Sequence, residues 1–416
     1  MVSHRSTVQG IPGPLQDRRR RLIYTPSQHH LNISMDYYCS AKFTDLQVHV
    51  QGRLLYNCCK AYPERVDLDW LEANPGRLFH TDTMLKDRKL MLDNKSCASC
   101  HHGCYKYEEQ GLTSAREDHI NEDKISDPQA PIRHLDISLS TDCNLTCMYC
   151  SSEWSSSWQR DVEKNGDYFL NGVPVKQNDN WSNLWSKMKQ KSRSTDSRFF
   201  DLLIKEIKLA DELESISILG GEPLLNNQLD QLLNYVDGKE INITTGLGVS
   251  DERLRKVLQK TKGMDVRFQI SGESTGELFE LIRHGVTWKD FQDRVEMIEQ
   301  SGHKIKFIST ISNLSILGFA DFYEKYHGSH EITLNNLTDA DWMMPHVLDT
   351  QSKMDFIDST QSKKNLPEFK RLLRMIKDTP DDTHRANMGD YLKQFSSRRS
   401  IDLDFLPEHF LKWCGL

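Results

Sequence analysis

The sequence predicts an α/β protein built on a parallel β-sheet. From Arg133 onward, short β-like runs alternate with segments whose apolar residues recur at spacings of three and four, the pattern of amphipathic helices. The expected strands are residues 134–139, 215–219, 241–245, 266–271, 305–311 and 331–334. The clearest helices between them are expected at 199–213 and 288–301. Strands that alternate with helices are typical of parallel sheets, because each helix carries the chain back to start the next strand.

Changes in composition divide the chain into four parts. Residues 1–34 are polar and are expected to be a flexible leader, whereas residues 35–122 hold six of the cysteines and are expected to form a small domain. An acidic, turn-rich stretch separates that segment from the α/β domain, expected at 131–345, and a helical region is expected at 346–416. The α/β domain contains a polar insert, 151–198, which is a candidate to close over the functional site. The insert carries four tryptophans: Trp154, Trp158, Trp181 and Trp185.

The charge balance argues against polyanionic partners. The chain has 53 basic and 60 acidic residues in 416, a formal net charge of -7, so the whole-protein field does not favour nucleic acid or an anionic membrane. The run Arg18–Arg21 could contact phosphates, although a solvated leader is the simpler interpretation. No stretch approaches the roughly 20 apolar residues that span a bilayer, and the N-terminus lacks the apolar core of a secretion signal. We therefore expect a soluble, cytoplasmic protein with no membrane partner.

The cysteines are concentrated at the front of the chain. Nine of the ten lie at or before residue 150, and Cys414 stands alone near the C-terminus. Because the cytosol is reducing, this number of cysteines favours metal binding or catalysis over structural disulfides. We expect the metal chemistry in the first part of the protein.

Three cysteines follow the first expected strand at close spacing. Cys143, Cys147 and Cys150 are separated by three and then two residues, so a short loop can direct all three thiolates to one place. Iron-sulfur clusters take thiolate ligands, and a four-iron cluster usually has four of them, so three would leave one iron open to another ligand. The alternatives are a zinc site that lacks a ligand or unrelated buried thiols.

This triplet, with Tyr149 before its last cysteine, resembles the signature of the radical S-adenosylmethionine superfamily. The resemblance covers about residues 133–340 and implies a partial, TIM-like (β/α)6 barrel that is open on one side. It also implies a [4Fe-4S] cluster whose open iron is chelated by the amino and carboxylate groups of S-adenosylmethionine. One-electron reduction then cleaves the cofactor to a 5'-deoxyadenosyl radical, and the electron would come from a donor such as flavodoxin or ferredoxin. Tyr149 would pack near the adenine.

Motifs after later strands extend the resemblance. Gly220, Gly221 and Glu222 match the family's glycine-rich segment that binds the cofactor's amino group, and glycines suit a place where backbone must approach another group closely. Ser271 would reach the ribose or carboxylate of the cofactor. Arg283 would contact its carboxylate, because a guanidinium fork suits that group. Taken alone, the glycines would indicate an ordinary turn and Arg283 a surface ion pair.

The front cysteines resemble the auxiliary-cluster domains called twitch and SPASM. In those domains a glycine-containing hairpin presents one cysteine and a downstream pair presents others, which fits Gly52 before Cys58 and the pair Cys97 and Cys100. The resemblance implies a second iron-sulfur cluster. The expected ligands are Cys39, Cys58, Cys97 and Cys100, with Cys59 and Cys104 as substitutes. Here the segment precedes the barrel instead of following it, and the gap from Gly52 to Cys58 is one residue longer than usual. A zinc ribbon or a covalent haem at Cys97–His101 are the alternatives.

These patterns predict an oxidoreductase that abstracts hydrogen from a substrate carbon. We favour oxidation or cross-linking of a peptide or protein side chain, with a sugar, nucleoside or other small metabolite as the alternative substrate. A zinc- or cluster-bearing binding protein is the alternative from another class. No residue stands out as a catalytic acid or base.

Overall fold

The computed structural model describes residues 36–58, 61–109, 114, 116, 119–120, 124–175, 196–236, 238–337 and 340–416. Within it, Tyr37–Leu416 form one compact unit. The predicted leader, with Arg18–Arg21, lies outside the described residues, as do Cys59, Trp181 and Trp185.

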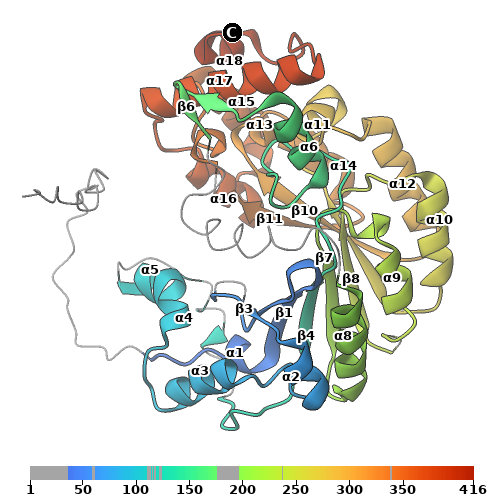
Figure 1. The fold of residues 1–416 in the computed structure, drawn as a ribbon. Coiled ribbons are helices and arrows are strands. Elements are labelled where there is room, and N and C mark those ends of the chain that lie inside the picture. Colours follow the sequence, from blue (N-terminus) through green and yellow to red (C-terminus); the bar gives the residue numbers. More distant parts are fainter. Residues whose placement is uncertain are drawn as a thin grey trace, which may run out of the picture. The chain divides into compact units, whose positions relative to one another are not determined.

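A nine-stranded sheet organises this unit, in the order β11-β10-β9-β8-β7-β4-β1-β2-β3 (Figure 1). All six predicted strands are present and pair in parallel with their neighbours. They are β4 (His134–Ser138), β7 (Ser215–Leu219), β8 (Glu240–Thr245), β9 (Val266–Ser271), β10 (Lys304–Ile311) and β11 (Glu331–Asn336). The α/β prediction is therefore confirmed, and the parallel order brings the carboxyl ends of all six strands to the same edge of the sheet.

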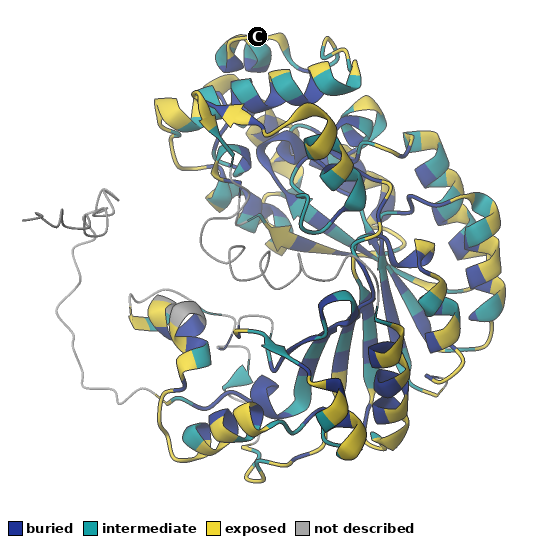
Figure 2. Cartoon of the chain, in the orientation of Figure 1, coloured by how far each residue is buried: buried dark blue, intermediate teal, exposed yellow. Residues whose placement is uncertain are grey.

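Helices cover one face of these strands, and their buried sides turn toward the sheet (Figures 1 and 2). They are α8 (Ser197–Leu209), α9 (Asn227–Leu232), α10 (Asp251–Lys260), α11 (Gly276–Ile282), α12 (Trp288–Gln300), α13 (Asn313–Ile316) and α14 (Phe319–Tyr326). Phe307 of β10 packs against Phe291 of α12 and Phe322 of α14. Side chains alternate across a strand, so the residues next to Phe307 lie on the other face.

That other face of the sheet is polar. Asp136, Asn242 and Gln269 occupy it, and the Gln269 side-chain amide donates a hydrogen bond to Asn242 Oδ1 at 3.3 Å. Thr244 Oγ1 donates to Gln269 Oε1 at 3.1 Å. A face lined by amides, hydroxyls and a carboxylate does not form an apolar core, so this surface suits a polar ligand better than another packed layer.

The cysteine-rich front segment contributes three strands to the same sheet. β1 pairs in parallel with β4, β2 pairs antiparallel with β1, and β3 pairs with β2. The elements are α1 (Ala41–Thr44), β1 (Asp45–His49), a 3₁₀ turn (Val50–Gly52), β2 (Leu54–Tyr56), β3 (Glu64–Arg65), α2 (Leu68–Ala73), α3 (Asp82–Leu92), α4 (Ala98–Cys100), a π-helical turn (His101–Tyr105) and α5 (Lys106–Glu109). The segment predicted as a domain of its own is therefore continuous with the barrel strands.

The first part of the polar insert packs against the C-terminal helices. The insert forms α6 (Ser156–Asn165) and a hairpin of β5 (Phe169–Leu170) and β6 (Val173–Pro174). The C-terminal region contains α15 (Thr350–Ser359), α16 (Pro367–Met375), α17 (Asp382–Arg399) and α18 (Glu408–Cys414). Phe169 N donates to Gln394 Oε1 at 3.0 Å, and Gln394 Nε2 donates back to Phe169 O at 2.6 Å. These bonds fix the hairpin on α17.

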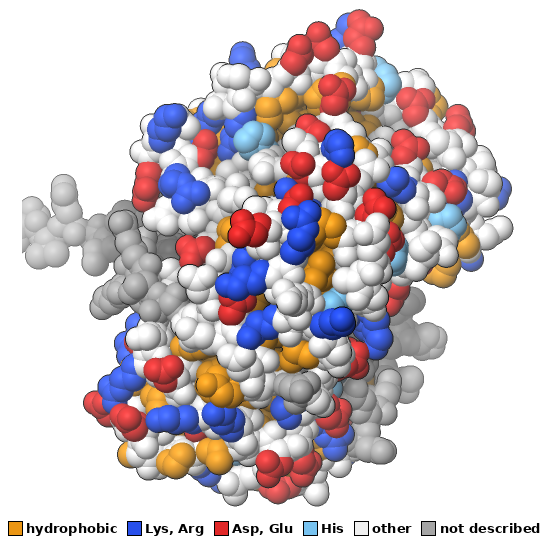
Figure 3. All heavy atoms as spheres, turned by 90° about the vertical axis from the view of Figure 1, so that its right-hand side faces the viewer, with side chains coloured by type: hydrophobic (Ala, Val, Ile, Leu, Met, Phe, Trp, Pro, Cys, Tyr) orange, Lys and Arg blue, Asp and Glu red, His pale blue; other side chains and the backbone are white. Residues whose placement is uncertain are grey.

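No helix in the described part of the chain is both long and apolar enough to cross a membrane. On the face seen in Figure 3, lysine and arginine side chains are interspersed with aspartate and glutamate, without a wide area of one sign. This face therefore shows no basic surface of the kind that binds a phosphate backbone.

Candidate active site

The loop after β4 carries the cysteine triplet and is held from several directions. Trp158 of α6 is fully buried, and its indole Nε1 donates to Cys147 O at 2.9 Å. Thr146 N donates to His284 O at 2.8 Å, and the Tyr391 hydroxyl of α17 donates to Met148 O. The insert, the segment after α11 and a C-terminal helix therefore all bond to the backbone of the loop and hold its shape.

Glycines after β7 allow this loop to approach closely. A Cβ at Gly221 would lie 2.5 Å from Asp142 O, and one at Gly220 would lie 2.6 Å from Ser140 O. Gly220 also has φ +133°, a conformation that side chains resist. The sequence predicted that backbone approaches these glycines closely. In the structure, the approaching backbone is that of the residues just before Cys143. Their contact with a cofactor stays a prediction.

Three further glycines surround Leu145, at the centre of the triplet. Side chains at Gly246, Gly248 or Gly285 would each press on Leu145, at 2.7, 2.8 and 3.1 Å from its methyl carbons. Leu145 is buried, so it anchors the loop to the ends of β8 and α11. The packing explains why small residues occur after several strands at this edge of the sheet.

The three thiols lie close enough to influence one another. Burial, together with the neighbouring Cys147, raises the pKa of Cys143 to about 12. Burial also raises the pKa of Cys150, and the nearby Cys147 and Cys143 contribute to this increase. All three are free thiols. The iron-sulfide core of a [4Fe-4S] cluster is cationic and would offset this mutual repulsion and favour the thiolates, so the donor set fits such a cluster.

A buried ion pair lies beside the triplet. Arg283 donates from Nε and Nη2 to Glu273 Oε2 at 3.2 and 2.8 Å, and its Nη1 lies 3.8 Å from Cys147 Sγ. The Tyr149 hydroxyl donates to Glu273 Oε1 at 3.2 Å. The structure therefore joins two predicted cofactor residues through a carboxylate that the sequence reasoning missed. The sequence feature that could have indicated it is an acidic residue two positions after β9, in the string Ser271-Gly272-Glu273.

Glu222 is buried and fully engaged by its surroundings. Its Oε1 accepts hydrogen bonds from Thr245 Oγ1 at 2.8 Å and Leu224 N at 3.2 Å, while Oε2 accepts from Gly246 N at 3.0 Å. Burial raises the pKa of this carboxyl. Glu222 therefore joins the ends of β7 and β8, and its predicted bond to the cofactor's amino group stays a prediction, as does the role of Ser271 at the last position of β9.

A second group of thiols surrounds a cavity in the front segment. The cavity has a volume of about 130 Å³, and the thiols that line it are Cys39, Cys58, Cys100 and Cys104. Cys97 does not line the cavity, but its Sγ lies 3.4 Å from Cys100 Sγ. The structure thus brings together the four predicted ligands and adds Cys104, one of the two predicted substitutes.

Two buried cations line the same cavity. Lys42 is 0% exposed and Arg116 is 4% exposed. Arg116 donates to the Glu108 carboxylate and to Tyr38 O, the latter at 2.7 Å. Burial alone would lower the pKa of Lys42, but nearby Cys100 and Asp87 reverse this and leave it raised. The cations make the cavity suitable for thiolates or another anionic group.

Among the residues that the structure describes, no three His, Cys, Asp or Glu side chains are placed to bind one ion together. Zinc needs four ligands at about 2.3 Å from one point. In a cluster, each thiolate binds a different iron, so the thiols surround a space. The thiols of Cys39, Cys58, Cys100 and Cys104 line a space of this kind.

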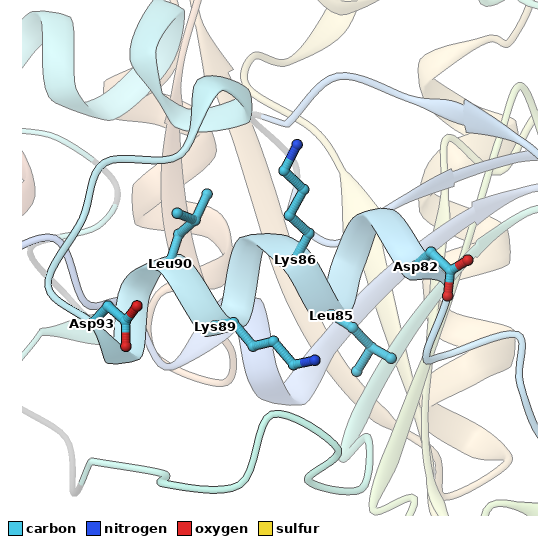
Figure 4. Close-up of a pocket in the computed structure, with 6 residues that line it drawn as sticks. All are labelled: Asp82, Leu85, Lys86, Lys89, Leu90 and Asp93. Atoms are coloured by element: carbon cyan, nitrogen blue, oxygen red, sulfur yellow. The ribbon is translucent and has the colours of Figure 1, made fainter.

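A larger hollow of about 340 Å³ lies elsewhere in the front segment. The residues that line it belong to α3 or directly follow it, namely Asp82, Leu85, Lys86, Lys89, Leu90 and Asp93 (Figure 4). These residues supply no thiol and no group from a second element, so the hollow does not resemble a metal or cofactor site.

The comparisons with known proteins agree with the geometry at the end of β4. Residues 137–321 match the family model described as the Radical SAM superfamily, a match that covers less than half of the chain. This part of the chain is a radical SAM domain, and the protein is an enzyme. No curated protein matches the sequence.

Solved structures show weaker likenesses. The chain is similar to anSMEcpe with bound AdoMet, at 17% identity and a TM-score of 0.37, over 60% of this chain and 61% of that one. It is also similar to SuiB of Streptococcus suis bound to the precursor peptide SuiA, at 14% identity and a TM-score of 0.35, over 87% of this chain and 71% of that one. Identities and TM-scores this low do not establish a shared overall fold.

Proposed function

We propose that the protein cleaves S-adenosylmethionine reductively and uses the resulting radical to abstract hydrogen from a substrate carbon. The carrying observation is the loop of Cys143, Cys147 and Cys150, which the surrounding elements hold in place at the carboxyl edge of a parallel sheet within the radical SAM domain. A [4Fe-4S] cluster with bound S-adenosylmethionine would supply the 5'-deoxyadenosyl radical. The electron would come from a small donor protein such as flavodoxin or ferredoxin.

The chain's own residues would hold and shield this centre. The three thiolates bind the cluster, and Arg283 places a positive charge beside Cys147. Tyr149 and Arg283 are joined through Glu273, so the residue expected near the adenine and the residue expected near the carboxylate have fixed orientations. Trp158 and Tyr391 bond to the backbone of the loop and bury it. This burial protects a radical centre from water.

We also propose an auxiliary iron-sulfur cluster in the front cavity. Cys39, Cys58 and Cys100 belong both to the predicted ligand set and to the cavity lining, while Cys97 and Cys104 compete for the fourth position. The volume of the cavity, the thiols that line it and the two buried cations support a cluster there. The cluster would accept an electron from the product radical or help to hold the substrate.

For the substrate we propose a peptide or protein side chain that is oxidised or cross-linked. The polar inner face of the sheet, with its amide and hydroxyl groups, supports a hydrophilic substrate that can form many hydrogen bonds. A sugar, nucleoside or other small metabolite is the alternative. A mass-shift screen with peptides and sugars distinguishes them.

The test of the proposed function needs no substrate. Anaerobically loaded protein, reduced with dithionite, should convert S-adenosylmethionine slowly to 5'-deoxyadenosine and methionine, measured by chromatography and mass spectrometry. Protein with Cys147→Ala is the control and should give neither product. Intact cofactor after long incubation with fully loaded, unmodified protein would contradict the proposal.

A further inference from the structure

Lys42 is a fully buried lysine that lines the front cavity. It lies on α1, and its side-chain nitrogen Nζ donates to Asn57 Oδ1 at 2.7 Å, to Asp87 Oδ2 at 3.2 Å and to Ser99 Oγ at 2.7 Å. Burying an ammonium is costly even when it is paired, so its retention inside the protein calls for an explanation.

The partners of Lys42 lie next to the cysteines. Asn57 directly precedes Cys58, and Ser99 lies between Cys97 and Cys100. Three segments that are distant in sequence therefore meet at one ammonium group. This arrangement fixes the backbone from which the thiols of Cys58 and Cys100 extend into the cavity.

Lys42 also places a positive charge at the wall of the cavity, because its side chain lines it. The Asp87 carboxylate is shared, because it accepts hydrogen bonds from both the Lys42 ammonium and the Ser99 hydroxyl. A four-iron cluster with four thiolates is negatively charged, and reduction by one electron adds a further negative charge. A buried cation nearby stabilises the reduced form more than the oxidised form, because the field is poorly screened there.

We propose that Lys42 is a positioning residue that holds the Cys58 and Cys100 segments around the cavity and raises the reduction potential of the cluster bound there. The inference rests on the auxiliary cluster of the proposed function. The reaction concerned is the addition of one electron to the cluster, supplied in the test by dithionite through redox mediators, with no bond made or broken.

The experiment uses protein with Cys143→Ala, Cys147→Ala and Cys150→Ala, in which only the front cluster can give a signal. Anaerobic redox titration followed by electron paramagnetic resonance gives its midpoint potential. In this background Lys42→Met should lower the midpoint potential, and Lys42→Arg should keep it closer to the parent value. Asp87→Asn removes a negative charge and should raise it. Lys95→Met is the matched control, because Lys95 is exposed, pairs only with nearby Asp93 and should leave the potential unchanged.

The outcomes separate the inference from the proposal on which it rests. If the triple-alanine background holds no iron, the auxiliary cluster itself is wrong. If it holds iron but Lys42→Met and Asp87→Asn leave the potential unchanged, or move it in the same direction, the inference about Lys42 is wrong. If Lys42→Met folds by circular dichroism but loses its iron while Lys42→Arg keeps it, the positioning role is supported and Asp87→Asn decides the electrostatic one.

Discussion

The two thiol sites use the same ligand atoms but are built in opposite ways. The barrel triplet lies within eight consecutive residues, and the rest of the protein closes around that one loop. The front site collects thiols from Cys39 to Cys104, and its shape depends on contacts between α1, the residue after β2, α3 and α4. A local site can be recognised from spacing alone, whereas a site assembled from distant segments needs the fold.

The sites also differ in their place on the shared sheet. His134 and Asp136, which line the front cavity, lie in the first half of β4, and the triplet follows the end of that strand. The four steps from His134 to Ser138 alone span about 13 Å. The front segment also contacts the residues just before the triplet, because Thr141 N and Oγ1 donate to Gln51 Oε1 at 2.9 and 3.1 Å. We therefore expect variants of one site to spare the other.

The largest expected effect comes from the triplet itself. Cys147→Ala removes a ligand of the cofactor-binding cluster, so cleavage of S-adenosylmethionine should fall below detection while the iron of the front site remains. Product analysis and iron determination on the same sample check this. Retained cleavage would show that Cys147 is not a ligand.

The next effect concerns the glycine contact that shapes the loop. In Gly221→Ala, the new Cβ meets Asp142 O at 2.5 Å, so we expect a loss of about 1–3 kcal/mol in the free energy of unfolding and a lower iron content in the barrel. Denaturant unfolding and iron analysis measure the two effects. Gly328→Ala is the control, because a Cβ there has no neighbour within 4 Å. Equal losses in both variants would contradict the proposed packing role.

The front thiols should be needed for turnover of the substrate but not for cleavage of S-adenosylmethionine. Cys100→Ala should leave cleavage of S-adenosylmethionine intact but abolish turnover of the true substrate, because it removes a ligand of the auxiliary cluster only. Comparing the iron contents of Cys97→Ala and Cys104→Ala identifies the fourth ligand, whose loss lowers the iron more. If Cys100→Ala stopped cofactor cleavage as completely as Cys147→Ala while the barrel cluster remained, the two sites would be coupled.

The smallest expected effect is a pH dependence confined to the front segment. Burial, together with nearby Arg88, lowers the pKa of His80 from its usual 6.5 to about 4. The folded state therefore prefers neutral His80. The contribution of His80 to stability is present above about pH 6.5 and is lost as the pH falls toward 4. Between these pH values, the free energy of unfolding should fall less in His80→Gln than in the unmodified protein. Denaturant unfolding at several pH values measures this. An identical pH dependence would show that His80 is not responsible.

The same comparison explains what the sequence could and could not predict. All six barrel strands and the triplet follow from local patterns, because hydrophobic alternation and cysteine spacing lie within short windows. β1 was missed, because Asp45–His49 is short and acquires its role only by pairing with β4, far along the chain. Glu273 was missed because its partner Arg283 meets it only in the fold. The Lys42 contacts join residues up to 57 positions apart, beyond the reach of any sequence pattern.

The account rests on two separate iron-sulfur sites in one sheet, and iron analysis of two complementary variants tests it most directly. One variant carries Cys143→Ala, Cys147→Ala and Cys150→Ala, and the other carries Cys39→Ala, Cys58→Ala and Cys100→Ala. Each should retain part of the iron of the unmodified protein, the two parts should add up to the whole, and only the second variant should cleave S-adenosylmethionine. Complete loss of iron in the first variant, with no loss in the second, would contradict the account.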